Sequence, residues 1–304
     1  MYKWNETKLI EIFCSADDFC IEYQQLLTEK FIGEHQGKKV NEPGLSMSEI
    51  MSIEIFYHLS AHKCFKFYYT HYLEVHLKDY FPKMPSYNRF VQLKPRMAIF
   101  LFFYLYRCRI GEHTGCYYVD SAKLPACHNL RIYNHKVFRG IARRGKTSTG
   151  WFYGLKIHWI INEKGQLMAF TITPGNVADN NKELMLKLCG YIRGKIFGDK
   201  GYINQKAWEE LLNNGLLFFT KRRRNMKNVL LKMEDKILLN KRGVIESAIE
   251  LLKGLCNIDH TRHRSPINAI VNTFAGLAAY THLDKLPHIN MGEFQMRNFL
   301  PLAA

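Results

Sequence analysis

Three acidic side chains could act together on a substrate: Asp120, Asp199 and Glu246. A short β-rich run at 117–119 is expected to end at Asp120, and a second run at 195–198 is expected to end at Asp199. Acids at the ends of strands can meet at one rim of a sheet, and Glu246, on a later expected helix, can face the same rim. Each acid alone is more commonly a turn, cap or exposed helix residue, so its assignment depends on the surrounding sequence.

Three converging carboxylates repel one another unless cations lie between them. Hard oxygen ligands with open positions suit Mg²⁺, for which Mn²⁺ can substitute. A pair of such ions can activate a water molecule or a 3′-hydroxyl group and stabilise the leaving oxygen of a phosphodiester. The acids therefore predict metal-dependent chemistry on a phosphodiester.

The elements that would position these acids change character along the chain. Up to about Arg109 the apolar spacing is helical, and Pro95 is expected to kink or break a helix that runs into the apolar stretch 98–106. After about Gly111 the apolar residues recur every second position, which is typical of strands. The segments 155–161 and 166–173 are therefore expected to form a β-hairpin. The elements expected next are a helix at 182–192, the strand at 195–198, a helix ending near 213, a strand at 216–220, and helices around Glu246 and at 266–280.

This order of elements is that of a ribonuclease H-like core, in which a mixed sheet is flanked by helices. We therefore predict an α/β fold in three parts: a helical region at 1–110, a catalytic domain at 111–285 and a C-terminal tail at 286–304. Internal repeats and low-complexity tracts are absent from the sequence.

The charge of the chain is unusual for a globular protein, with a formal net charge of +16 and a pI near 9.4. Such a surplus favours a nucleic-acid partner, because a basic surface gains affinity by releasing counterions; a merely solvated basic surface is the alternative. The eight cysteines form no CxxC pair, which indicates a reducing cytoplasm. We expect neither a signal peptide nor a membrane-spanning segment.

Several short blocks follow one another in a specific order. They are 86–90, 118–121, 123–125, 127–129, 173–177, 197–202, the set Arg242, Glu246 and Lys253 with Arg-x3-Glu-x6-Lys spacing, and 260–266. Each block alone is loose, but together they resemble the DDE transposases of bacterial insertion sequences, in insertion sequence family 982. One position departs from the wider superfamily, where a Tyr stands in place of Leu239; that position is expected to contact substrate rather than metal.

The resemblance implies a ribonuclease H-like fold and a metal-binding catalytic triad of Asp120, Asp199 and Glu246, with Mg²⁺ or Mn²⁺ as cofactor. It implies double-stranded DNA as partner: terminal inverted repeats, which are cut, and target DNA, which the freed 3′-hydroxyl attacks. A homodimer or larger assembly on DNA is expected, in the bacterial cytoplasm and associated with the nucleoid. Recognition of the repeats by the helical region 1–110 is a hypothesis, since that region shows no distinct helix-turn-helix signature.

Basic side chains near the acids are candidate DNA contacts, with solvated surface residues as the alternative. One set follows Asp120 on an expected loop: Arg131, Lys136, Arg139, Arg143, Arg144 and Lys146. The others are Arg222, Arg223 and Arg224 after the strand at 216–220, and Arg242 and Lys253 on either side of Glu246. Asp179 is either a helix cap or an additional acid beside the site, and His158 either faces the site or is buried in the sheet.

Two other functions fit the same residues. A structure-directed nuclease on this fold would cut branched DNA or RNA without joining strands, so an assay of strand transfer separates it from a transposase. A catalytically silent protein would only bind DNA ends; the presence of all three acids argues against loss of the triad.

Overall fold

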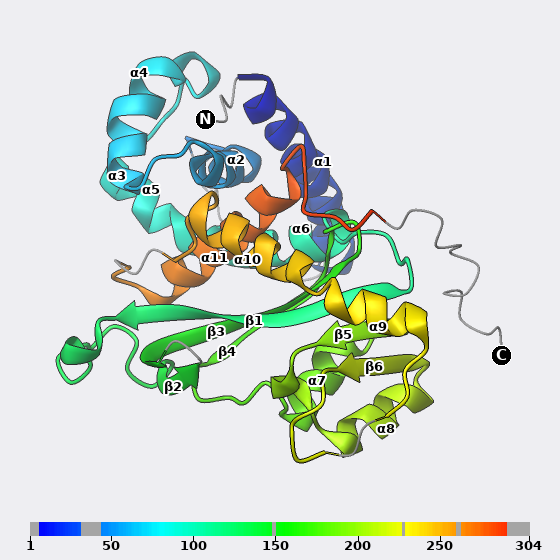
Figure 1. Ribbon diagram of the computed structural model, residues 1–304. Coiled ribbons are helices and arrows are strands. Elements are labelled where there is room, and N and C mark those ends of the chain that lie inside the picture. The colour runs from blue at the N-terminus through cyan, green and yellow to red at the C-terminus, as the bar shows by residue number, and fades with distance from the viewer. Residues whose placement is uncertain (1–5, 32–43, 148–149, 227–228, 260–262, 291–304) are drawn as a thin grey trace. The chain divides into compact units, whose positions relative to one another are not determined.

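The computed structural model describes residues 6–31, 44–147, 150–226, 229–259 and 263–290 (Figure 1). The chain forms two compact units. Unit 1 consists of 1–109, 252–258 and 263–282, and unit 2 consists of 110–251, 259–262 and 283–304. The helix at 266–281, which the sequence analysis placed within 111–285, thus packs with the N-terminal helices.

Unit 1 is helical in its described residues. Its longer helices are α1 (Glu6–Phe31), α2 (Met47–Leu59), α5 (Tyr87–Leu93), α6 (Met97–Cys108) and α11 (Pro266–Thr281), and its short segments are α3 (Phe65–Phe67), a π-helical turn (Tyr68–Leu73), α4 (Glu74–His76) and 3₁₀ turns at Lys78–Tyr80 and Lys94–Arg96. The second 3₁₀ turn contains Pro95 and separates α5 from α6. The expected break is therefore confirmed, and its cause is that proline has no N–H for the helical ladder.

Helix α2 is buried along almost its whole length and carries one acid into the core of unit 1. The Glu54 side chain is fully buried, and Lys94 Nζ lies 2.5 Å from its carboxylate. The same ammonium group lies 4.0 Å from the centre of the Phe65 ring. A buried carboxylate is tolerated only with such a partner, because transfer of an unpaired charge out of water costs several kcal/mol.

Unit 2 is built on one mixed sheet. Its strands are β1 (Cys116–Cys127), β2 (Arg143–Thr147), β3 (Gly150–Asn162), β4 (Leu167–Pro174), β5 (Gly194–Gly198) and β6 (Leu216–Thr220). They are ordered β2-β3-β1-β5-β6, and β4 also pairs with β3. Strands β1 to β4 pair antiparallel, whereas β1, β5 and β6 pair parallel. The predicted α/β fold, a mixed sheet flanked by helices, is confirmed.

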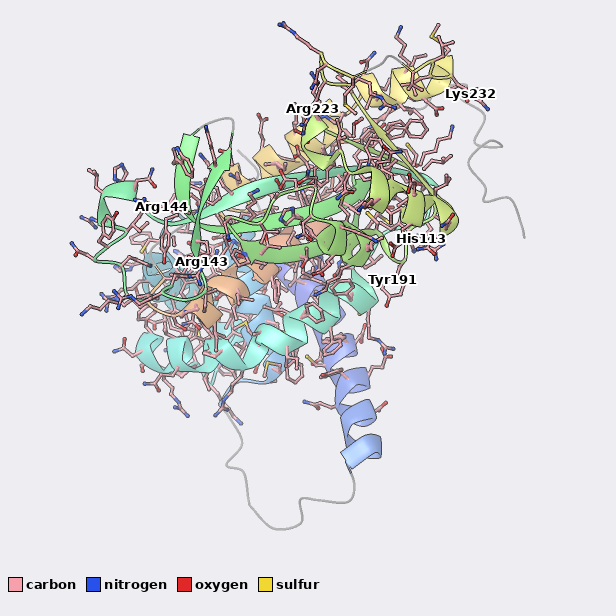
Figure 2. All side chains as sticks on the ribbon, turned by 90° about the horizontal axis from the view of Figure 1, so that it is seen from below. His113, Arg143, Arg144, Tyr191, Arg223 and Lys232 are labelled. Carbon is pink, nitrogen blue, oxygen red and sulfur yellow. The ribbon has the colours of Figure 1, made fainter. Side chains whose placement is uncertain are left out.

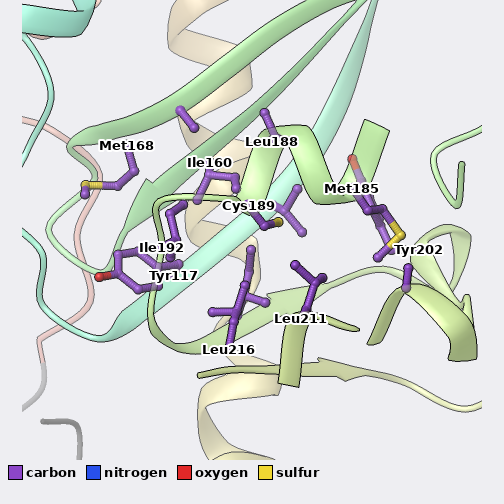
Figure 3. Packing of buried hydrophobic residues seen from close by; sticks show 14 residues of the cluster. Tyr117, Ile160, Met168, Met185, Leu188, Cys189, Ile192, Tyr202, Leu211 and Leu216 are labelled. Carbon is purple, nitrogen blue, oxygen red and sulfur yellow. The ribbon is translucent and has the colours of Figure 1, made fainter. Parts of the chain in front are cut away.

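Four helices of unit 2 flank this sheet: α7 (Lys182–Cys189), α8 (Gln205–Asn213), α9 (Met233–Asn240) and α10 (Gly243–Gly254), whose last turn belongs to unit 1. Helices α7 and α8 cover one face, where a buried cluster excludes water (Figure 3). The cluster includes Tyr117, Val119, Ile160, Met185, Leu188, Ile196, Leu211 and Leu216. Each fully buried side chain of this size contributes roughly 1.5–3 kcal/mol through the hydrophobic effect.

Two strands differ from the sequence expectation. Strand β1 does not end at Asp120 but continues to Cys127, because β3 supplies antiparallel partners from Tyr117 to Cys127. Residues 143–147, expected within a loop, form β2 against 150–154 of β3. In both cases the local sequence has only a weak preference for the strand conformation, and long-range pairing with β3 makes it a strand. Figure 2 shows that Arg143 and Arg144 of β2 lie well apart from Arg223, which follows β6 at the other edge of the sheet.

Candidate active site

Parallel pairing of β1 with β5 brings Asp120 and Asp199 together. The last paired residues are Tyr118 and Phe197, whose rings stack with centroids 5.5 Å apart. Each acid follows its aromatic residue by two positions, and residues two apart in extended chain point to the same face. That face is opposite the Tyr117 and Val119 side of β1 and is covered by α9, since the Tyr118 hydroxyl donates to the Leu238 carbonyl at 3.2 Å.

The Asp120 carboxylate is held by two donors. Its Oδ1 accepts the Ser121 backbone N–H at 2.8 Å, and its Oδ2 lies 3.3 Å from Nη1 of Arg242. Only 20% of the side chain is exposed. Burial raises the pKa of Asp120 to about 6, and the nearby carboxylates of Asp199 and Asp179 act in the same direction, against the Ser121 and Arg242 donors. Three acids are therefore close enough to repel one another.

Asp199 begins the 3₁₀ turn Lys200–Tyr202 immediately after β5. Its Oδ1 accepts the Gly201 backbone N–H at 2.6 Å. A Cβ on Gly201 would lie 2.7 Å from this oxygen and 3.5 Å from Oδ2 of Asp179, so glycine leaves room for both carboxylates. Tyr202 lies buried behind them, and its pKa is raised far above the usual range, first by burial and then by the three acids.

Arg242 connects Glu246 to this group. Glu246 lies in the first turn of α10, and Arg242 precedes that helix by one residue. Arg242 Nη2 lies 2.5 Å from Oε1 of Glu246, while its Nη1 contacts Asp120. The guanidinium thus bridges two of the three predicted acids. Glu246 is 56% exposed, so its half of the bridge is open to solvent.

Asp179 is a fourth acid beside the site. Asn181, not Asp179, caps α7, because the Asn181 side chain accepts the Leu184 N–H. Asp179 Oδ1 instead accepts from Ser121 Oγ and from Lys156 Nζ, both at 3.1 Å. Of the two readings of Asp179, the structure supports the additional acid. The neighbouring residues Lys156 and Ser121 were not assigned a role from the sequence, since it is the pairing of β3 with both β1 and β4 that brings them near Asp179.

His158 is fully buried in β3 and does not present a charged ring to the site. Its Nε2 lies 2.9 Å from Oγ1 of Thr173, and its Nδ1 lies 3.7 Å from Oδ1 of Asp179. Burial lowers the pKa of His158 to about 4, with Lys156 acting in the same direction and Asp179 against it. The imidazole is therefore neutral near pH 7 and belongs to the network that supports Asp179.

The donor set fits a hard divalent cation. Asp120, Asp199 and Glu246 supply carboxylate oxygens, which Mg²⁺ and Mn²⁺ prefer. Besides burial, the carboxylates of Asp199 and Asp179 raise the pKa of Asp120, and a cation would relieve that repulsion. Within the described ranges, however, no three His, Cys, Asp or Glu side chains are already arranged as a metal centre. Arg242 supplies the cationic partner of Asp120 and Glu246 in this arrangement.

The predicted DNA contacts fall into separate groups. Six are exposed between β1 and the end of β2: Arg131, Lys136, Arg139, Arg143, Arg144 and Lys146. Arg223 and Arg224 are exposed after β6, Arg222 is half-buried there, and Arg223 donates to the Lys200 carbonyl at 3.3 Å, next to Asp199. Lys253 is half-buried on the last turn of α10, which belongs to unit 1.

Residues 110–266, just over half of the chain, match the family model for the transposase DDE domain. The chain belongs to the DDE transposase family. Comparisons of the transposase with curated proteins and with solved structures give no match. The matched segment contains Asp120, Asp199 and Glu246, together with Asp179 and Arg242. Among the described residues of this transposase, no helix has the length and apolar character needed to cross a membrane.

Proposed function

We propose that this transposase cuts DNA at the ends of an insertion sequence and joins the freed 3′-hydroxyl to target DNA, with Asp120, Asp199 and Glu246 as its catalytic triad. The observation that carries the proposal is the proximity of Asp120 and Asp199 inside the segment that matches the DDE domain. Asp120 lies within β1, Asp199 directly follows the neighbouring parallel strand β5, and Arg242 connects Glu246 to Asp120.

The triad would hold Mg²⁺ or Mn²⁺. Such ions, when bound, activate the attacking water or 3′-hydroxyl and stabilise the leaving oxygen. Ser121 and Gly201 orient the Asp120 and Asp199 carboxylates through their backbone N–H groups, which leaves the second oxygen of Asp199 for a ligand. Arg242 pairs with both Asp120 and Glu246, and with metal ions on these acids its guanidinium would be available to a DNA phosphate.

The DNA partner would be double-stranded: terminal inverted repeats and a target site. The exposed cations between β1 and β2 and those after β6 would contact its backbone, which is the usual role of Lys and Arg outside the grooves. The helical region 1–110 would recognise the repeats. The proposal also includes a homodimer or larger assembly on DNA and membership in insertion sequence family 982. It places the protein in the bacterial cytoplasm, with the nucleoid. All of these rest on the motif resemblance.

The test uses labelled duplexes carrying the two DNA ends that flank the gene, with Mg²⁺ or Mn²⁺. Asp120→Asn, Asp199→Asn and Glu246→Gln are compared with the unchanged protein. Glu250→Gln is a matched control, since Glu250 is an exposed acid one turn further along α10. We expect the three triad variants to bind the ends without cutting or joining, and the control to do both. Cleavage by any triad variant at the rate of the unchanged protein would remove that residue from the triad.

The same assay separates the alternatives. A structure-directed nuclease would cut branched DNA and give no joined product. A protein that only binds ends would give a specific complex and no cleavage with any divalent ion.

A further inference from the structure

The segment between β1 and the core part of β3 forms a distinct feature, which we call the basic arm and define as residues 128–154. Its described part consists of 128–147 and 150–154. The arm contains six Lys or Arg residues, those named above as predicted DNA contacts, and no Asp or Glu. Such an unbalanced charge over one segment marks the binding surface for a polyanion.

The arm is firmly attached to the sheet. Strand β2 pairs with β3 at 150–154, where β4 no longer does. A Cβ on Gly145 would lie 2.0 Å from the Gly175 carbonyl oxygen, and one on Gly154 would lie 2.2 Å from the Leu124 carbonyl oxygen, so backbones pack directly against each other here. Asn129 Nδ2 donates to the Trp151 carbonyl at 2.9 Å and ties the start of the arm to β3.

Two large aromatic side chains of the arm are exposed, and each lies under a cation. Trp151 is 63% exposed, and Lys146 Nζ lies 5.7 Å from the centre of its ring. Tyr133 is 80% exposed, and Arg144 Cζ lies 5.6 Å from its ring. Lys146 and Trp151 are direct partners in the β2–β3 register. Arg144 is two residues before Lys146, so both cations point to the same face of β2.

This combination fits one chemical class of ligand. Cations alone would serve a duplex backbone, so that role does not account for two exposed rings set beside cations. Aromatic rings beside Lys and Arg are the means by which proteins bind unpaired nucleotides, in which the π-face of the base is free to stack while the phosphate meets the cation. In a duplex both faces of each base are already stacked.

We propose that the basic arm binds unpaired nucleotides of DNA by stacking bases on Trp151 and Tyr133, with Lys146 and Arg144 on the adjoining phosphates. The inference rests on the proposed function in that DNA is the substrate. Trp159, the β3 partner of Asp120, is eight residues from Trp151, which corresponds to about 26 Å of strand.

The test measures binding of an oligo(dT) strand of about 15 nucleotides, and of a duplex of the same length, in EDTA so that no cleavage occurs. Trp151→Ala is expected to weaken single-strand binding about 5- to 100-fold and duplex binding less than about twofold, because stacking is lost and charge is kept. Tyr133→Ala is expected to act in the same direction. Lys146→Gln is expected to weaken both complexes and to reduce the salt slope by about one.

Matched controls come from unit 2 itself. Tyr191 is an aromatic residue that is 89% exposed, Lys232 is an exposed cation, and both lie away from Arg143 and Arg144 (Figure 2). Tyr191→Ala and Lys232→Gln are expected to leave both affinities within about twofold. Trp151→Phe is expected to keep most of the affinity but to lose the quenching of tryptophan fluorescence by oligo(dT). If Trp151 had only a structural role, oligo(dT) would not quench its fluorescence in the unchanged protein.

Two results would overturn the proposal. If Trp151→Ala weakens single-strand and duplex binding by the same factor, the arm contacts only the backbone. If it weakens neither, no base stacks on Trp151. Failure of the proposed function is distinguishable, because Asp199→Asn removes cleavage without touching the arm, and the single-strand preference is measured without catalysis.

Discussion

Replacement of Asp120 by Asn is expected to stabilise the folded protein in the absence of divalent ions. The pKa of Asp120 is raised from an ordinary value of 3.8 to about 6, chiefly by burial. The ionised carboxylate is thus less favourable in the folded state than in the unfolded chain. A shift of about two units corresponds to about 3 kcal/mol, at 1.36 kcal/mol per unit.

The dependence on pH follows from the same shift. A group with a raised folded pKa destabilises the fold fully above about pH 6, and the effect fades as the pH falls through the window from about 6 to about 4, where the folded state keeps the proton. Asn keeps an oxygen for the Ser121 N–H, and Arg242 keeps its Glu246 partner. The gain is therefore expected to be about 2–3 kcal/mol at about pH 7.5 and about 1 kcal/mol at about pH 4.5.

Urea denaturation in EDTA at these two pH values measures the gain. Glu246→Gln is the control, because its side chain is 56% exposed and its charge stays in water. Added Mg²⁺ is expected to reverse the order, since an ion that binds the folded state stabilises the unchanged protein and lacks a ligand in the variant. A stability difference that is the same at both pH values, or an Asn variant less stable than the unchanged protein at about pH 7.5, would refute the reasoning.

Three further substitutions test the packing around the acids and in unit 1. Lys94→Met leaves the buried Glu54 without its cation and is expected to cost about 3–5 kcal/mol in urea unfolding; the double variant with Glu54→Leu should recover most of the loss. Lys156→Met removes the ammonium that lies 3.1 Å from Asp179 and is expected to cost about 2–4 kcal/mol, partly restored by adding Asp179→Asn, whereas equal losses in single and double variants would contradict the pairing. Gly201→Ala places a Cβ 2.7 Å from a triad oxygen, so the shift of the urea midpoint caused by Mg²⁺ should shrink, and an unaltered shift would count against a role for this turn.

Much of the sheet could be predicted because alternation of apolar and polar residues reports one buried face. The hairpin of 155–161 with 166–173 is confirmed by the β3–β4 register, and Asp199 does follow a short buried strand. Asp120 was expected at a strand end and lies within β1 instead. The two acids still meet, because β5 ends where β1 continues.

Other features could not be read from local patterns. The sequence 143–147 has two arginines, a glycine and a lysine, and it becomes a strand only because β3 extends beyond β4 and offers free backbone partners. The bridge from Arg242 to Asp120 joins residues 122 positions apart. Asp179 shows the same principle, since its partners on β1 and β3 are fixed by strand pairing rather than by neighbours in sequence.

Strand β3 is continuous from the arm to the position opposite Asp120. This continuity fixes the distance between the basic arm and Asp120 within unit 2. Proteins that must adjust the distance between two contacts usually do so at a hinge, where a few residues absorb the change in backbone angles. Between Trp151 and Trp159 the strand is paired throughout, with β2 at 151–154 and with β1 and β4 from Leu155 onward, and the one irregularity there lies on β1, between Pro125 and Cys127. DNA held at both ends of this strand would have to adapt its own shape, and duplex bending of this kind costs roughly 1–6 kcal/mol, depending on the sequence being bent. The deformability of the DNA beside the cut would then contribute to the choice of site, even at bases that no side chain touches.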